Sequence, residues 1–287
     1  MTLLDPAVAI LPYGKKLGFH PGRIFLDDLN WPLGQPERLI GKRLSDLSAD
    51  DHLILYPRGS VHFRIGFGTR AKVSLMVVEP KAIHGHHLKK LRISHRRFYR
   101  VLSCDEAFLS TIPNGVFQVY GTTWVPDWRQ ISIVKSANVS LIASAKRSQE
   151  GHRLRHALVD WASAEGVDMT ALGGGYAPFD EKSDGLAPYR FSVVIENIRE
   201  RNYFSEKLID AILCEAVPIY WGCPNIDEFL DTRGMIICET EAELRAAILS
   251  ATSEKYSALL PALRAIKSEA NSYADIESRA AQAVLQS

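Results

Sequence analysis

The sequence predicts an α/β protein made of two Rossmann-like domains with parallel sheets that face each other across a cleft. Strand-like and helix-like segments alternate along most of the 287 residues, which is typical of parallel sheets with crossover helices. Several strand-like segments are continuous apolar runs, as expected for strands buried on both faces. The length fits two domains. We expect them at residues 1–133 and 134–287, with the C-terminal helices free to pack back onto the first domain.

In the first half, two buried parallel strands are expected at residues 52–57 (HLILYP) and 71–80 (AKVSLMVVEP), and proline ends both. A basic helix over residues 86–100 should follow and lead into a short strand. The segment 115–125 (GVFQVYGTTWV) is a further strand candidate, which PDW interrupts.

The second half repeats the alternation. We expect an amphipathic helix at 151–166, a second helix at 205–216, and helices from 241 to the C-terminus. The expected strands are 138–145, a strand before the glycines of 171–176, 189–197, 217–222 and 234–238.

Composition narrows the function. The net charge is +1, from 34 basic and 33 acidic residues, so no global field favours nucleic acid. No apolar run reaches membrane-spanning length, and the N-terminus lacks the pattern of a signal peptide. Four widely spaced cysteines, without a CxxC pair, indicate reduced thiols. We expect a cytoplasmic protein, or one at the inner face of the membrane with at most peripheral contact.

The seam between the strand 189–197 and the next helix carries an unusual density of polar residues. Ligands of open α/β sheets lie beyond the carboxyl ends of the strands. Ser205 is placed to cap the helix, whose N-terminal N–H groups suit an anion such as a diphosphate. Lys207 opposes the helix dipole, which suggests that an anion lies between them. The alternative is that Lys207 is a solvated surface residue.

These residues also carry a specific resemblance. The segment from 189 to 222 resembles the signature of the family 10 glycosyltransferases, the α-1,3/1,4-fucosyltransferases, and of their bacterial members most. The resemblance weakens toward the N-terminus. The matching residues are Tyr189, Arg190, Phe191, Glu196, Asn197, Tyr203, Ser205, Glu206, Lys207, Pro218 and Gly222.

The resemblance implies a GT-B-like architecture and an inverting transfer of L-fucose from GDP-fucose to a glycan hydroxyl, such as O3 of N-acetylglucosamine. A lipopolysaccharide or surface polysaccharide is the acceptor expected by analogy. The family also has an arginine on the first helix of the donor domain, where Arg155 is favoured and Arg153 is the alternative. The implied donor residues are Arg155, Glu196, Asn197, Tyr203, Ser205, Glu206 and Lys207.

A general base is needed as well, and the resemblance implies that the first domain supplies it. Glu79 closes an apolar strand and precedes Pro80, where a carboxylate reaches the mouth of a cleft. A capping or salt-bridged Glu79 is the alternative, and Asp105 is the second candidate base. Glu196, for its part, contacts the donor or pins backbone N–H groups at the turn.

A metal is not expected. The run HGHH (84–87) lacks a second ligand cluster and indicates a solvated loop, and no DxD element follows a donor-domain strand. We therefore expect no obligatory cofactor. The basic stretch 84–100 either faces an anionic acceptor or is a solvated helix face. Two rival functions remain: transfer of another nucleotide-linked deoxysugar, or a degenerate member that binds a glycan or partner without catalysis.

Overall fold

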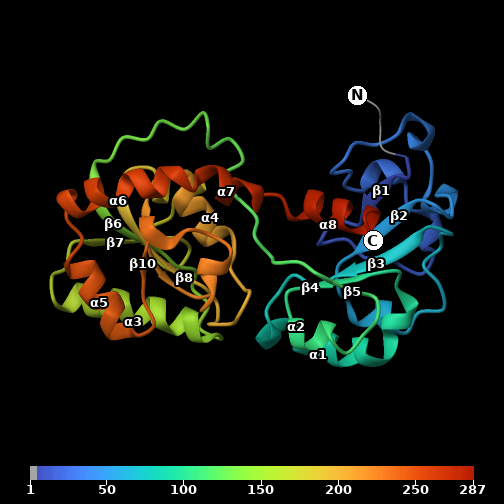
Figure 1. The fold of residues 1–287 in the computed structure, drawn as a ribbon, viewed down its shortest axis with the longest axis horizontal. Coiled ribbons are helices and arrows are strands. Elements are labelled where there is room, and N and C mark those ends of the chain that lie inside the picture. The colour runs from blue at the N-terminus through green and yellow to red at the C-terminus, as the bar shows by residue number, and fades with distance from the viewer. Residues whose placement is uncertain (1–4) are drawn as a thin grey trace. The chain divides into compact units, whose positions relative to one another are not determined.

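The chain forms two compact units, each built on its own parallel sheet (Figure 1). The structure is a computed structural model that describes residues 5–287. Unit 1 contains the residues up to Tyr120 together with Ile276–Ser287, and unit 2 contains Gly121–Asp275. The boundary after Tyr120 differs from the one expected after residue 133, because Thr123 and Trp124 already bond to a helix of unit 2.

The sheet of unit 1 has five parallel strands in their sequence order. Each new strand is added on the same side of the previous one, and the connections between parallel strands are right-handed. All these connections therefore lie on the same face of the sheet. The strands are β1 (Val8–Ile10), β2 (His52–Leu55), β3 (Lys72–Met76), β4 (Val101–Ser103) and β5 (Gly115–Phe117).

Helices from distant parts of the chain cover the two faces of this sheet. Helix α1 (Lys81–Ser94) and the short α2 (Glu106–Leu109) lie on one side. Helix α8 (Ile276–Leu285) lies on the other (Figure 1). There its apolar residues Ile276, Ala280 and Val284 pack against strands β1 to β4. The crossovers leave one face of this sheet uncovered, and the last helix covers that face.

The sheet of unit 2 has the strand order β10-β9-β8-β6-β7, and all its pairings are parallel. The chain moves one way from β6 to β7, then returns to the other side of β6 at β8. The strands are β6 (Ala137–Ile142), β7 (Met169–Leu172), β8 (Tyr189–Ile195), β9 (Val217–Trp221) and β10 (Ile236–Ile237).

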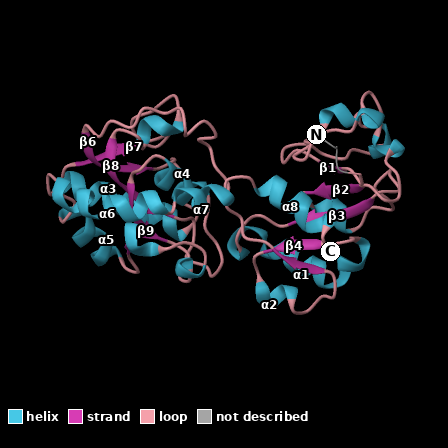
Figure 2. Cartoon of the chain, turned by 45° about the horizontal axis from the view of Figure 1, so that its top comes forward, coloured by secondary structure: helices cyan, strands magenta, loops and turns pink. Residues whose placement is uncertain are grey.

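This reversal places the helices of unit 2 on both faces. Helices α3 (Glu150–Ala164) and α5 (Glu241–Leu249) cover one face. Helices α4 (Glu206–Leu213), α6 (Ser253–Ala265) and α7 (Lys267–Ser272) cover the other, as Figures 1 and 2 show. Helix α4 is almost fully buried, because its residues pack against β8, β9 and α7. Glu206, a polar residue of the seam that lies on α4, is therefore placed in the interior.

The expected elements are largely present, with three corrections. The strand expected over 115–125 ends at Phe117. Residues 84–87 are not a solvated loop, because they lie in α1, where His84 and His87 are buried. Strand β1 was not predicted. Within residues 5–287, no helix has the length and apolar character needed to cross a membrane.

Candidate functional site

The polar seam lies at the point where the strand order of unit 2 reverses. β6 and β8 are neighbours in the sheet, but their following helices go to opposite faces. The loops after their carboxyl ends therefore diverge, and sheets of this topology usually bind ligands at the crevice between such loops. The segment between β6 and α3 is one of these loops, and residues 196–205 form the other.

Gly151 joins the two loops. Its N–H donates to the carbonyl of Asn197 at 3.0 Å. A Cβ at this position would lie only 1.8 Å from the carbonyl oxygen of Glu196, so any other residue would push the helix and the strand end apart. Glycine is therefore required for the first turn of α3 to sit against the end of β8.

Glu196 pins the start of α4 from inside the protein. Its side chain is fully buried, and one carboxylate oxygen accepts from the N–H of Ser205 at 2.8 Å while the other accepts from the Ser205 hydroxyl at 2.6 Å. Burial raises the pKa of Glu196, and the charge of Lys207 works against this rise. The expected pinning role of Glu196 is present in the structure.

Lys207 is held by the same group of residues. Its ammonium donates to Glu206 Oε1 at 2.9 Å and to Ser205 Oγ at 3.0 Å, and it lies 3.8 Å from Glu196 Oε2. Burial lowers the pKa of Lys207, but the carboxylates of Glu206 and Glu196 outweigh it and leave the pKa above its usual value. Its side chain keeps 22% exposure.

Arg155 reaches the seam from α3. Its guanidinium donates to the carbonyl of Ile195 through Nε at 3.1 Å and also through Nη2, and Nη2 donates to Asn197 Oδ1 at 3.3 Å. The side chain is 4% exposed. Arg153 is exposed and donates instead to the carbonyl of Ser148. The structure thus brings Arg155, rather than Arg153, into contact with the seam.

Tyr203, another of the implied donor residues, lies in the interior. It is 1% exposed and belongs to the buried core of unit 2. The other expected donor residues gather at the strand end and helix start: Arg155, Glu196, Asn197, Ser205, Glu206 and Lys207.

Two charged residues at this site were missed. Asp210 accepts from the hydroxyl of Thr123 at 2.6 Å and from the N–H of Trp124 at 3.1 Å. Burial raises its pKa to about 7. Burial also lowers the pKa of Lys182, which the charges of Asp210 and Glu206 oppose. Asp210 could have been predicted as a site residue, because it is an acid four residues after Glu206 on an otherwise apolar helix. No sequence feature indicated Lys182.

The two candidate bases of unit 1 have different surroundings. Glu79 is partly buried just after β3, and its N–H donates to His84 Nδ1 at 3.3 Å. The charge of Glu79 adds to burial in raising the pKa of Tyr13, so the carboxylate and the phenol are close. Asp105 caps α2 through the N–H of Phe108 at 2.9 Å and pairs with Lys81 at 2.9 Å. Asp105 is thus engaged in holding α2.

His87 of α1 is hydrogen-bonded to His62, and both side chains are buried, as is His84. His62 Nε2 lies 2.9 Å from His87 Nδ1, and His62 Nδ1 lies 2.9 Å from Ser94 Oγ. Burial lowers the pKa of His62 and of His84 to about 4 and that of His87 to about 3. Within residues 5–287, no three His, Cys, Asp or Glu side chains are arranged to hold a metal ion.

Sequence comparison links the chain to named proteins. No family model matches it. A protein of Arabidopsis thaliana named as fucosyltransferase-like is 29% identical over 140 residues, which is 47% of this chain and 26% of that protein. The α-(1,3)-fucosyltransferase FucT of Helicobacter pylori is 33% identical over 55 residues, which is 19% of this chain and 12% of the enzyme. The chain is thus similar in sequence to parts of two proteins named as fucosyltransferases or fucosyltransferase-like. It aligns with well under two thirds of either relative's length.

Solved structures show the same fold. An α1,3-fucosyltransferase with GDP-fucose has a TM-score of 0.53 at 15% identity, covering 93% of this chain and 92% of that one. A Staphylococcus aureus TarM mutant solved with UDP has a TM-score of 0.55 at 11% identity, covering 83% and 55%. These likenesses support the GT-B fold class, with two parallel-sheet α/β domains, for this chain.

Proposed function

We propose that this chain is a fucosyltransferase that takes L-fucose from GDP-fucose and transfers it to a hydroxyl of a glycan. The observation that carries the proposal is the cluster of Lys207, Glu206 and Arg155 around the buried Glu196 at the crevice of unit 2. Glu196, Glu206 and Lys207 belong to the segment that resembles fucosyltransferases, and Arg155 reaches them from α3. The cluster combines the positive charges of Lys207 and Arg155 with the N-terminus of α4, which is the chemistry that a sugar diphosphate needs.

Donor binding would rearrange one ion pair. Lys207 is now neutralised by Glu206 at 2.9 Å. A diphosphate offers Lys207 a stronger partner, because it carries more charge and more acceptor oxygens. Glu206 then becomes free to accept hydrogen bonds from hydroxyls of the fucose or the ribose. Arg155 adds positive charge from α3, and Asn197, Tyr203 and Ser205 complete the proposed donor set.

The proposed reaction is a single displacement. The acceptor oxygen forms a bond to C1 of fucose, while the bond between C1 and the diphosphate oxygen breaks and its electron pair leaves with GDP. The acceptor proton passes to Glu79, the proposed general base. Lys207 stabilises the charge that grows on the leaving diphosphate. Because the attack comes from the face opposite GDP, the β-linked donor yields an α-linked fucose.

The finer assignments are part of the same proposal. O3 of N-acetylglucosamine, or of a similar sugar in a lipopolysaccharide or surface polysaccharide, is the proposed acceptor. We propose that no divalent cation is obligatory, since Lys207 and Arg155 supply the positive charge that a metal would otherwise bring.

The test is a donor panel with purified protein and an acceptor that contains N-acetylglucosamine. GDP-fucose should react, whereas GDP-mannose and UDP-N-acetylglucosamine should not, and EDTA should leave the rate unchanged. Glu79→Gln should lower kcat by about a hundredfold or more while donor binding persists. Transfer from a different nucleotide sugar would replace the fucose assignment. Donor binding without transfer to any acceptor would support a non-catalytic relative.

A further inference from the structure

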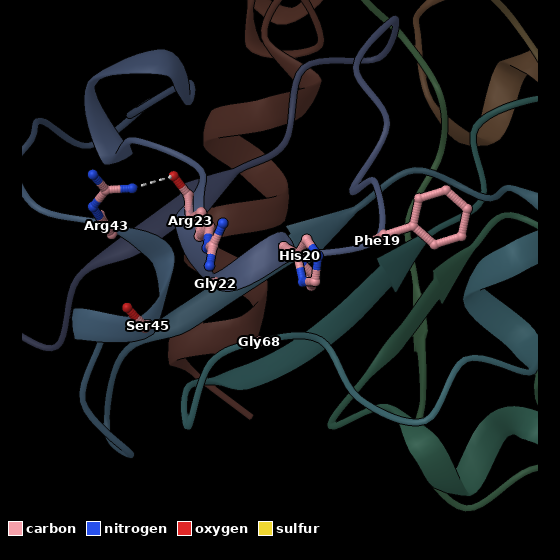
Figure 3. Close-up of a pocket in the computed structure, with 8 residues that line it drawn as sticks. Phe19, His20, Gly22, Arg23, Arg43, Ser45 and Gly68 are labelled. Carbon is pink, nitrogen blue, oxygen red and sulfur yellow. Dashed lines mark hydrogen bonds between the residues drawn. The ribbon is translucent and has the colours of Figure 1, made fainter.

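Unit 1 contains a hollow of about 730 Å³ whose wall is rich in arginine. Figure 3 shows Arg23, Arg43 and Ser45 on neighbouring segments, with His20 nearby and Phe19 at the far rim. The volume fits one or two sugar rings, since small-molecule sites commonly measure about 300–1,000 Å³. We call this site the arginine hollow.

The two arginines are carried by a rigid frame. The segments on which they lie pair through the N–H of Leu44, which donates to the carbonyl of Ile24 at 2.9 Å. The Arg43 guanidinium lies 4.6 Å from the centre of the Phe25 ring and donates to the carbonyl of Arg23 at 3.2 Å. Arg43 is thus oriented before any ligand arrives, which limits the entropy that binding would cost.

Two of the loops that line the hollow pack closely against each other. A Cβ on Gly22 would lie 2.9 Å from the carbonyl oxygen of Gly68, so the two loops touch directly. Nearby, Arg64 donates to the carbonyl of Gly18 at 3.1 Å. That contact brings a third guanidinium next to the loop that carries Phe19.

The guanidinium groups of Arg23 and Arg43 are not engaged in ion pairs within the described part of the chain. No ion pair joins Arg23 or Arg43 to a carboxylate anywhere in residues 5–287. No acid belongs to the lining. The nearest acid in sequence, Asp46, accepts instead from the backbone N–H of Arg43 at 2.8 Å. Two guanidinium groups that share a hollow repel each other unless an anion enters.

We propose that the arginine hollow binds the oxyanion of an acidic sugar, a carboxylate or sulfate, within the acceptor glycan. Planar guanidinium groups bind such oxygens in pairs. Ser45 and His20 offer hydrogen bonds to ring hydroxyls, and Phe19, which is 98% exposed, offers an apolar face at the rim. The statement that this acidic sugar belongs to the acceptor rests on the proposed function. The binding of an acidic sugar to the arginine hollow does not depend on it.

The experiment titrates the full chain, without donor, by calorimetry. The probe is a heparin-derived tetrasaccharide, chitotetraose is its neutral counterpart, and sodium sulfate is the free ion. The tetrasaccharide should bind at least tenfold more tightly than either. The double variant R23Q/R43Q should weaken binding at least tenfold. The matched double variant R129Q/R233Q removes the same charge from exposed positions of unit 2, and should change binding less than twofold.

A second pair of variants leaves the arginine contacts in place. Ser45→Asp puts a carboxylate into the hollow and should weaken binding at least tenfold, whereas Ser45→Asn should stay within twofold. The proposal is wrong if both double variants weaken binding equally, if Ser45→Asp binds like the wild type, or if the tetrasaccharide does not bind. Equal binding of sulfate would show an adventitious ion only, and would overturn it too. Tetrasaccharide binding in a chain that transfers no fucose would refute the proposed function alone.

Discussion

The hydroxyl of Ser205 lies 2.6 Å from the buried carboxylate of Glu196, and the N–H of Ser205 lies 2.8 Å from the other oxygen of that carboxylate. One residue thus supplies both hydrogen bonds to a charge-bearing group with no exposure to water. The same hydroxyl accepts from Lys207 at 3.0 Å. Ser205 therefore links the end of β8 to the first turn of α4 and to Lys207, the residue that we propose binds the diphosphate.

Ser205→Ala should destabilise unit 2. The change removes one partner of a buried carboxylate and the cap of α4, and either loss commonly costs about 1–3 kcal/mol. Urea unfolding followed by circular dichroism measures the change. Ser163→Ala, at an exposed position of α3, is the control and should stay within about 0.5 kcal/mol. Equal stability of both variants would mean that Glu196 does not depend on Ser205.

Gly151→Ala should disrupt the crevice from the side of α3. The added Cβ would lie 1.8 Å from the carbonyl of Glu196, and relieving such overpacking typically costs about 1–3 kcal/mol or more. GDP-fucose affinity should fall as well, because Arg155 moves with α3. Gly174→Ala is the control, since its Cβ would meet no atom within 4 Å. Unchanged melting and affinity in Gly151→Ala would refute the tight approach.

Asp210 should make stability fall as pH rises. Its pKa is about 7 in the folded chain against an ordinary 3.8. Between these values the folded state holds a proton that the unfolded state has lost, so folding is favoured at the acid end and this stability is lost by about pH 7. Asp210→Asn keeps an acceptor oxygen for Thr123 and cannot ionise. The variant should gain stability over the wild type at pH 8 and differ little at pH 4.5.

The buried histidines should have the opposite effect on stability to that of Asp210, so that stability falls as pH falls. Their pKa values in the fold are about 4 for His62 and His84 and about 3 for His87, against an ordinary 6.5. The unfolded chain therefore binds protons first, and stability that is present above pH 6.5 is lost progressively toward pH 4. Hydrogen exchange resolved by segment should show α1 losing protection before α6, which contains no histidine, as pH falls from 7 to 5. Equal loss in both helices would contradict this.

Much of the fold and most of the site were predictable from the sequence. Buried parallel strands leave continuous apolar runs, so β3, β8 and β9 were clear. Glu196 and Lys207 flank a strand end and a helix start, and parallel topology brings such positions to one edge of a sheet. The short β1 was missed because a three-residue strand leaves little pattern.

What the sequence could not show depends on partners far along the chain. Asp210 is held by Thr123, and the need for Gly151 comes from the carbonyl of Glu196. The run at 84–87 resembled a solvated loop by composition alone. Its burial follows from His62, which lies 25 residues before His87. Such contacts are set by tertiary packing, which local patterns do not encode.

The most direct test of the account is calorimetric titration of GDP-fucose into the wild type and Lys207→Met, each with and without EDTA. Lys255→Met is the control, because that ammonium bonds to Ser250, outside the donor cluster. The account predicts wild-type binding that survives EDTA, a loss of at least tenfold in Lys207→Met, and little change in Lys255→Met. Absence of binding to the wild type, or undiminished binding to Lys207→Met, would contradict the proposed donor site.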